Sequence, residues 1–197
     1  MMTNPLRCLY DRAMRIAAHK HAAWGLAGIS FIESSVFPIP PDVVLMPMCL
    51  ADRSKSFRYA TICTVASVLG GILGYAIGYF LFESVGKTVL NFYGLMEQFA
   101  SFQEKYNAWG GWIVFAGGLT PIPYKVITIA SGVTHMNIAV FCMASVAGRA
   151  ARFYLVAALL WKYGMPIQAF IEKYLGLLTI LFFALLIGGF IGLKYLL

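Results

Sequence analysis

The chain has 197 residues, of which 60% are hydrophobic and only 12% are charged, about half the charged fraction that is typical of soluble domains. Fifteen lysines and arginines against eight acidic residues give a net charge of +7, but the cations are scattered or lie at the ends of apolar runs instead of forming a basic stripe. These features exclude a cytosolic globular enzyme, a disordered chain, a secreted disulfide scaffold and a nucleic-acid-binding domain. They favour an all-α protein whose solvent is a lipid bilayer.

The first predicted element, residues 1–21, is a basic amphipathic segment suited to the membrane surface. Arg7, Arg12, Arg15 and Lys20 are interleaved with apolar side chains at helical spacing. No small-residue cleavage site follows soon after the next apolar stretch, so we do not expect a secretory signal.

The next apolar region consists of two runs that are each too short to cross a bilayer. As helices, residues 22–32 and 43–51 would each be about 14–17 Å long, roughly half a bilayer. Between them lie Pro38, Pro40 and Pro41, which lack amide donors and push the preceding residues out of helical geometry. This pattern predicts a re-entrant hairpin with a proline-rich tip inside the membrane, and a single kinked span is the alternative.

Residues 59–82 form the first predicted complete span, because they contain no charge and are long enough to cross. The connection that follows carries apolar residues at helical intervals, which predicts an amphipathic interfacial helix over about residues 86–107.

Small residues recur every four positions along this first span, at Ala66, Gly70, Gly74 and Gly78. Such a stripe permits close approach of a neighbouring helix or of another protomer. We therefore expect a close helix contact along it, and homo-oligomerisation stays open.

A second hairpin and two further spans complete the expected elements. The apolar runs 112–119 and 126–133 flank a second tip at Pro121 and Pro123. Residues 137–161 follow as a span with two arginines near its middle, and the charge-free residues 174–193 form a C-terminal span.

The distribution of Lys and Arg favours the re-entrant interpretation of the first hairpin. The N-terminal segment and the loop at residues 52–58 are rich in Lys and Arg, whereas the longer connection at residues 83–105 contains only Lys87 and Lys105. A re-entrant hairpin places both basic segments on one side, which the positive-inside rule makes cytoplasmic, together with the N-terminus.

The two halves of the membrane region align as an internal repeat. Residues 38–44 (PIPPDVV) match residues 121–127 (PIPYKVI), and residues 66–71 (ASVLGG) match residues 144–149 (ASVAGR), in the same order. Because each unit crosses once, the second copy enters from the opposite face, which makes an inverted-topology repeat of the transporter type. Chance matching of apolar sequence is the alternative.

The predicted parts of the chain are an N-terminal segment (1–21), repeat 1 (about 22–82), an interfacial helix (about 86–107), repeat 2 (about 110–162) and a C-terminal helix (163–197).

Five charged side chains fall at membrane depth: Glu33, Asp42, Lys125, Arg149 and Arg152. Charges there are expensive, so they usually face a cavity or a partner and mark functional sites. One hypothesis is that they meet near the midplane and bind an anionic head group, since arginine binds phosphate through two parallel hydrogen bonds. A low-dielectric setting favours the protonated form of Glu33, which could then exchange protons. The alternative is a set of internal ion pairs that only fixes the hairpins to the span.

The hairpins resemble those of the DedA superfamily (SNARE-associated Golgi, or VTT, proteins), and in particular its YqaA-like bacterial branch. Residues 31–35 (FIESS) and 37–42 (FPIPPD) are similar to the family's acidic first hairpin, and residues 117–132 are similar to its second. The resemblance covers about residues 22–162. It implies that Glu33 and Asp42 are the family's two functional acids.

The family's usual arginines around the second hairpin have no direct match here. Gly118 and Tyr124 stand about where those arginines are expected, and Lys125 is adjacent. Because of this difference, the resemblance does not by itself identify the exact substrate.

The resemblance implies a flippase or scramblase for an anionic lipid or a lipid carrier such as undecaprenyl phosphate, in the bacterial plasma membrane, linked to the proton gradient and to membrane homeostasis. A membrane-organising protein without transport and a proton- or ion-coupled solute carrier are the alternatives. We expect no enzyme, cofactor or metal site, because no H-E-x-x-H, G-x-S-x-G or paired-aspartate motif occurs and the four cysteines form no C-x-x-C pair.

Overall fold

The computed structural model describes residues 22–36, 40–120 and 123–164, and the regular structure of these residues is entirely helical. The predicted N-terminal segment (1–21), the predicted C-terminal span (174–193) and the tip residues Pro38 and Pro121 lie outside the described residues. In chain order, the elements are α2 (Ala22–Ser35), α3 (Asp42–Ala51), a 3₁₀ turn (Arg53–Lys55), α4 (Ser56–Leu81), a π-helical turn (Phe82–Gly86), α5 (Lys87–Tyr93), α6 (Met96–Leu119), α7 (Tyr124–Val133) and α8 (Ile138–Tyr163).

Helices α4 and α8 are the two long central helices, and their positions confirm the helices predicted at residues 59–82 and 137–161. Each has 26 residues, or about 39 Å at 1.5 Å per residue. In length and apolar composition, both are able to cross a membrane. The Asn137 side chain caps α8 by accepting hydrogen bonds from the amides of Ala139 and Val140. Gly164, which has a positive φ of 66°, follows its end.

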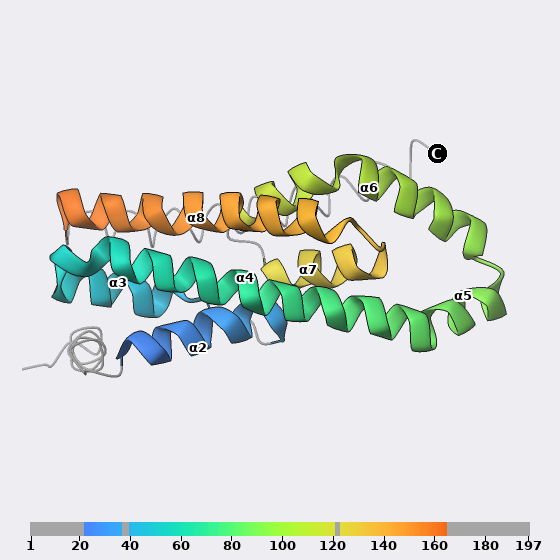
Figure 1. The fold of residues 1–197 in the computed structure, drawn as a ribbon, viewed down its shortest axis with the longest axis horizontal. Coiled ribbons are helices and arrows are strands. Elements are labelled where there is room, and N and C mark those ends of the chain that lie inside the picture. Colours follow the sequence, from blue (N-terminus) through green and yellow to red (C-terminus); the bar gives the residue numbers. More distant parts are fainter. Residues whose placement is uncertain (1–21, 37–39, 121–122, 165–197) are drawn as a thin grey trace, which may run out of the picture.

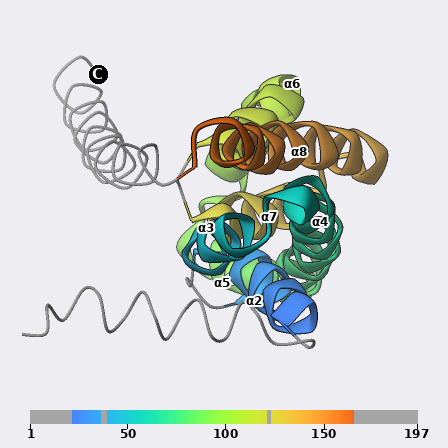
Figure 2. The same ribbon diagram turned by 90° about the vertical axis from the view of Figure 1, so that its left-hand side faces the viewer.

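Four shorter or more polar helices pack around this central pair. Helix α2 lies along the first half of α4, and α3 packs against α8 and α4 (Figure 1). Helix α6 lies along α8, and α7 packs against the second half of α4. The view along the bundle shows α4 and α8 side by side with these helices around them (Figure 2). Each proline-rich tip therefore joins a helix on α4 to a helix on α8.

Gly70 and Gly78 of the small-residue stripe of α4 make close helix contacts, as the sequence predicts. A methyl group at Gly70 would collide with the backbone carbonyl of Phe31 on α2, and one at Gly78 would collide with the carbonyl of Ile129 on α7. From the other side, a methyl group at Gly132 of α7 would overlap the carbonyl of Tyr75. Both α2 and α7 thus approach α4 backbone to backbone, which a side chain at these positions would prevent.

The helices of residues 87–119 begin and end at other positions than the predicted interfacial helix (about 86–107) and second hairpin (from about 110), a division into parts that stays a prediction. The helix break occurs earlier, at Gly94, which adopts the left-handed conformation with φ 66°. Helix α6 then continues without interruption through Gly110 and Gly111. These glycines do not end the helix. Gly110 instead leaves room for the Met136 side chain, whose sulfur would lie 3.0 Å from an added methyl group.

Candidate functional site

The candidate site lies at the middle of the bundle, where the end of α2 and the start of α3 meet the centre of α8. Glu33 is near the last turn of α2, and Asp42 is the first residue of α3. Arg149 and Arg152 are three residues apart on α8, so they share one face of that helix.

Arg149 and Glu33 form a buried ion pair. The Arg149 Nη2 lies 2.5 Å from the Glu33 Oε2, and the two side chains are only 2% and 8% exposed. The same nitrogen donates to the Ser34 Oγ at 3.0 Å. Ser34 is also 2.6 Å from the Ser67 Oγ of α4, so this pair connects α2, α4 and α8.

Arg152 forms the second buried pair, with Asp42. Its Nη2 donates to the Asp42 Oδ2, and its Nη1 donates to the carbonyl of Thr120 at the end of α6. Arg152 therefore holds the start of α3, from the first hairpin, and the end of α6, from the second hairpin, against α8.

Aromatic rings cover the Arg149 guanidinium. Its central carbon is 4.1 Å from the centroid of the fully buried Tyr124 ring and 5.6 Å from that of Phe153. The Tyr124 hydroxyl lies 2.5 Å from the Ser145 Oγ, one turn before Arg149 on α8. The ring faces attract the cation and exclude water from it.

Lys125, the fifth predicted charge, lies at the start of α7 and has a different partner. Its Nζ donates to the carbonyl of Val36 at 3.0 Å. No salt bridge to Lys125 occurs within residues 22–36, 40–120 and 123–164. Lys125 thus joins the two hairpin tips and keeps its positive charge uncompensated by a carboxylate of this part of the chain.

Each ion pair leaves one buried polar atom without a hydrogen bond. The Asp42 Oδ1 and the Arg149 Nε have no partner among the residues that the structure describes. Neither arginine makes the two-point contact that a guanidinium can make with a carboxylate or a phosphate. The site can therefore accommodate one more hydrogen-bond acceptor at the Arg149 Nε and one more hydrogen-bond donor at the Asp42 Oδ1.

The structure places the four predicted charges of α2, α3 and α8 in direct contact and Lys125 at the adjoining tips. Their role in binding a substrate or an ion stays a prediction. Of the predicted tip prolines, Pro40, Pro41 and Pro123 are described, and their carbonyls accept hydrogen bonds from the first turns of α3 and α7.

Sequence reasoning did not include Tyr124, Ser67 or Ser145 in the site. One signal was available for the serines, because Ser67 and Ser145 occupy the same place in the two aligned blocks of the repeat. Each hydroxyl hydrogen-bonds to a tip-side residue, Ser67 to Ser34 and Ser145 to Tyr124. No pattern in the sequence separates the role of Tyr124 from that of an apolar core aromatic.

Replacing Tyr124 with leucine is expected to lower the free energy of unfolding by about 2–4 kcal/mol, because the cavity and the lost ring face act together. The conservative Tyr124→Phe variant keeps the ring and loses only the Ser145 hydrogen bond, so we expect a loss of about 1 kcal/mol. Chemical unfolding in detergent measures both. Equal losses of unfolding free energy in Tyr124→Leu and Tyr124→Phe would show that the hydroxyl, and not the ring over Arg149, stabilises the site.

The described residues contain no group of three or more His, Cys, Asp or Glu side chains that could hold a metal ion.

Comparison with known proteins assigns the family. The model of the VTT domain matches residues 39–162, which is more than half of the chain. An uncharacterized protein of Haemophilus influenzae is 39% identical over 151 residues, covering 77% of this chain and 78% of the relative. A protein of Histophilus somni, described as an uncharacterized HI0703 homolog, is 38% identical over 151 residues with the same coverage of both chains. No solved structure matches the chain. The chain belongs to the VTT-domain family, that is, to the DedA (SNARE-associated) family of membrane proteins.

Proposed function

We propose that this protein is a non-enzymatic lipid transporter of the bacterial plasma membrane. Its substrate is an anionic lipid or a lipid carrier such as undecaprenyl phosphate, which it moves across the bilayer as a flippase or scramblase, with protons exchanged at the buried acids. The observation that carries this proposal is the pair of arginines at the middle of the bundle, each held by a carboxylate through a single guanidinium nitrogen.

The packing of the two halves supports a re-entrant, inverted-repeat architecture. Both α2 and α3 lie beside the half of α4 that begins at Ser56, and the end of α2 and the start of α3 lie near the middle of the bundle (Figure 1). A methyl group at Gly70 would collide with the Phe31 carbonyl, and one at Gly148 would collide with the Phe115 carbonyl. Gly70 and Gly148 are equivalent in the aligned blocks, so α2 meets α4 as α6 meets α8.

The charges at one end of the bundle support the proposed orientation. The start of α4 and the turn before it carry Arg53, Lys55 and Arg58, and the end of α8 carries Lys162. Asp52 is the acid in the turn and is paired with Lys55. By the positive-inside rule, this end is cytoplasmic. A re-entrant first hairpin places the start of α2, and therefore the N-terminus, on the same side.

The mechanism that we propose is an exchange of partners at the two arginines. A phosphate head group offers oxygens for two parallel hydrogen bonds from one guanidinium, which is a better match than the present single-point contact. When Glu33 or Asp42 takes up a proton, its arginine loses the negative partner and becomes available to the phosphate. One proton and one negative charge then enter the site together, so the low-dielectric interior gains no net charge.

Reconstituted vesicles that contain undecaprenyl phosphate or fluorescent anionic lipids test this proposal. We expect translocation that depends on a pH gradient. Arg152→Lys is expected to slow it at least about tenfold, because an ammonium cannot supply the planar two-point contact. Arg58→Lys, an exposed position on α4, serves as the matched control and is expected to transport normally. Normal transport by Arg152→Lys would refute phosphate capture by this guanidinium.

Substitution of the acid tests the proton step separately. Glu33→Gln removes the charge that protonation would remove, so transport is expected to continue with a weaker dependence on the pH gradient, which then rests on Asp42 alone. Unchanged pH dependence in Glu33→Gln would rule out this carboxyl as the proton-exchanging group.

One observation favours a second candidate, a protein that organises the membrane without transport. Both arginines are already neutralised by carboxylates, and these pairs join α2, α3 and α6 to α8. Under this alternative, the wild-type protein moves no lipid in vesicles, and charge substitutions act only through stability.

A further inference from the structure

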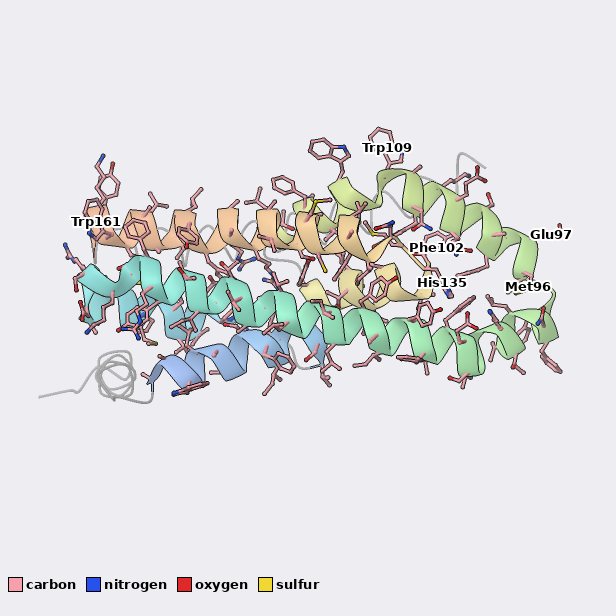
Figure 3. All side chains as sticks on the ribbon, viewed as in Figure 1. Met96, Glu97, Phe102, Trp109, His135 and Trp161 are labelled. Carbon is pink, nitrogen blue, oxygen red and sulfur yellow. The ribbon has the colours of Figure 1, made fainter. Side chains whose placement is uncertain are left out.

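A second cluster of charged and aromatic side chains lies far from the candidate site, around the turn at residues 134–137 that joins α7 to α8. Figure 3 shows His135 of this turn between α4 and α6, toward the end of the bundle opposite to Trp161. His135 has a φ of 54°, the left-handed conformation, and no other non-glycine residue within the described ranges has a positive φ.

Backbone carbonyls on both sides of His135 tie the turn to its neighbours. The Thr134 carbonyl accepts hydrogen bonds from the side-chain amides of Gln103, at 2.8 Å, and Asn107, at 2.9 Å, both on α6. The Tyr75 hydroxyl of α4 donates to the Met136 carbonyl at 2.6 Å. The turn thus connects α4, α6, α7 and α8, and His135 projects from its centre.

The imidazole of His135 lies next to two aromatic rings and a carboxylate. Its ring centroid is 4.4 Å from that of Tyr79 and 5.6 Å from that of Phe82. Its Nε2 is 3.2 Å from the Glu83 Oε1 and makes no hydrogen bond to the described residues. The other Glu83 oxygen binds the Nζ of Lys87 at 2.7 Å. The titratable groups that face His135 are therefore Tyr79 and Glu83, with Lys87 behind Glu83.

We propose that His135 and Glu83 form a pH-responsive latch that fastens the α7–α8 turn to the end of α4. Histidine gains its positive charge as the pH falls from about 8 to 5, while a glutamate stays ionised over most of that range. The charged imidazole pairs with Glu83 across 3.2 Å, and this pair adds to the hydrogen bonds that already hold the turn. At higher pH the imidazole is neutral, and the latch is weaker.

Lys87 competes for the same carboxylate but does not replace the histidine. It reaches Glu83 from α5, four residues along the same stretch of helix, so this pair does not cross to the α7–α8 turn. When Lys87 is removed, His135 is the remaining positively charged partner of the Glu83 carboxylate in this cluster. The pH response of the turn therefore depends on His135 and Glu83 and survives the loss of Lys87.

Hydrogen–deuterium exchange of a peptide that covers residues 130–140 tests the latch, measured in detergent at pH 5.5 and 8.0 and corrected for intrinsic exchange. In the wild type, we expect exchange about two- to fivefold slower at pH 5.5, the effect of one partly exposed ion pair on local opening. His135→Asn and Glu83→Gln are expected to remove this difference in exchange rate between the two pH values. Asparagine is chosen because it tolerates the left-handed backbone at residue 135.

Lys87→Met is the matched control, because it removes a charge from the same cluster and is expected to keep the pH response. The proposal is overturned if the wild type shows no difference between the two pH values. It is also overturned if Glu83→Gln, at a partly exposed position, keeps the wild-type ratio of exchange rates at the two pH values. Loss of that ratio in Lys87→Met would overturn it as well.

Discussion

Replacing Arg149 with methionine is expected to lower the free energy of unfolding by about 3–5 kcal/mol, because it leaves the Glu33 carboxylate buried without its partner. The guanidinium is almost fully buried and contacts Glu33, Ser34 and the Tyr124 ring. Chemical unfolding in detergent measures the change. Arg58→Met, at an exposed arginine of α4, is the matched control and is expected to change stability by less than about 0.5 kcal/mol.

A double variant separates the charge from the packing. Glu33→Leu combined with Arg149→Met removes both buried charges, and replacing a buried pair by apolar residues is often neutral or stabilising. We therefore expect the double variant to recover most of the stability lost in Arg149→Met. A double variant whose loss equals or exceeds the sum of the single losses would show that the pair is not coupled as its 2.5 Å contact implies.

Replacing Gly70 with alanine is expected to destabilise the fold by at least about 1–3 kcal/mol, because the new methyl group would overlap the Phe31 backbone and force α2 away from α4. Since the obstacle is backbone carbonyl and not a flexible side chain, it cannot move aside locally. Thermal unfolding in detergent measures the effect.

Gly25→Ala provides the matched control on α2, since nothing lies within 4 Å of an added methyl group there. Alanine has the better helix propensity, so this variant is expected to gain about 0.5–1 kcal/mol. The same sign of change at Gly25 and Gly70 would mean that propensity, and not the close approach of α2 to α4, sets the outcome at Gly70.

The sequence predicts the long helices and the short helices near the tips well, for a simple physical reason. An uninterrupted apolar stretch, as in residues 59–82, leaves the backbone no alternative to helix inside a membrane. Proline at Pro40, Pro41 and Pro123 marks where helices α3 and α7 begin, because it lacks an amide donor and restricts its predecessor.

The extent of α6 could not be predicted in the same way. The predicted amphipathic helix ends at about residue 107 and the next apolar run begins at residue 112, with Gly110 and Gly111 between them. Whether a glycine ends a helix depends on the conformation that tertiary contacts select for it. Gly94 takes a positive φ and ends α5, while Gly110 stays helical against Met136.

The site was predicted as a set of charges, with ion pairing as one alternative, but which acid pairs with which arginine was not predicted. A charge at membrane depth needs a partner, which is enough to single out the acids and the arginines. Which acid meets which arginine depends on how the end of α2 and the start of α3 meet α8, and Glu33 and Arg149 are 116 residues apart in the chain. One sequence without the fold does not contain that pairing.

The central claim is that the first hairpin enters and leaves the membrane on one side, bringing Glu33 and Asp42 to α8 at mid-depth. Single cysteines at Trp24, Ser54 and Ser101, in a chain whose native cysteines are replaced by serine, test it by labelling with a membrane-impermeant maleimide in sealed, oriented vesicles. All three positions are exposed on the protein. The account predicts that positions 24 and 54 react from the same side and position 101 from the other. Labelling of positions 24 and 54 from opposite sides would mean a complete crossing and would contradict the account.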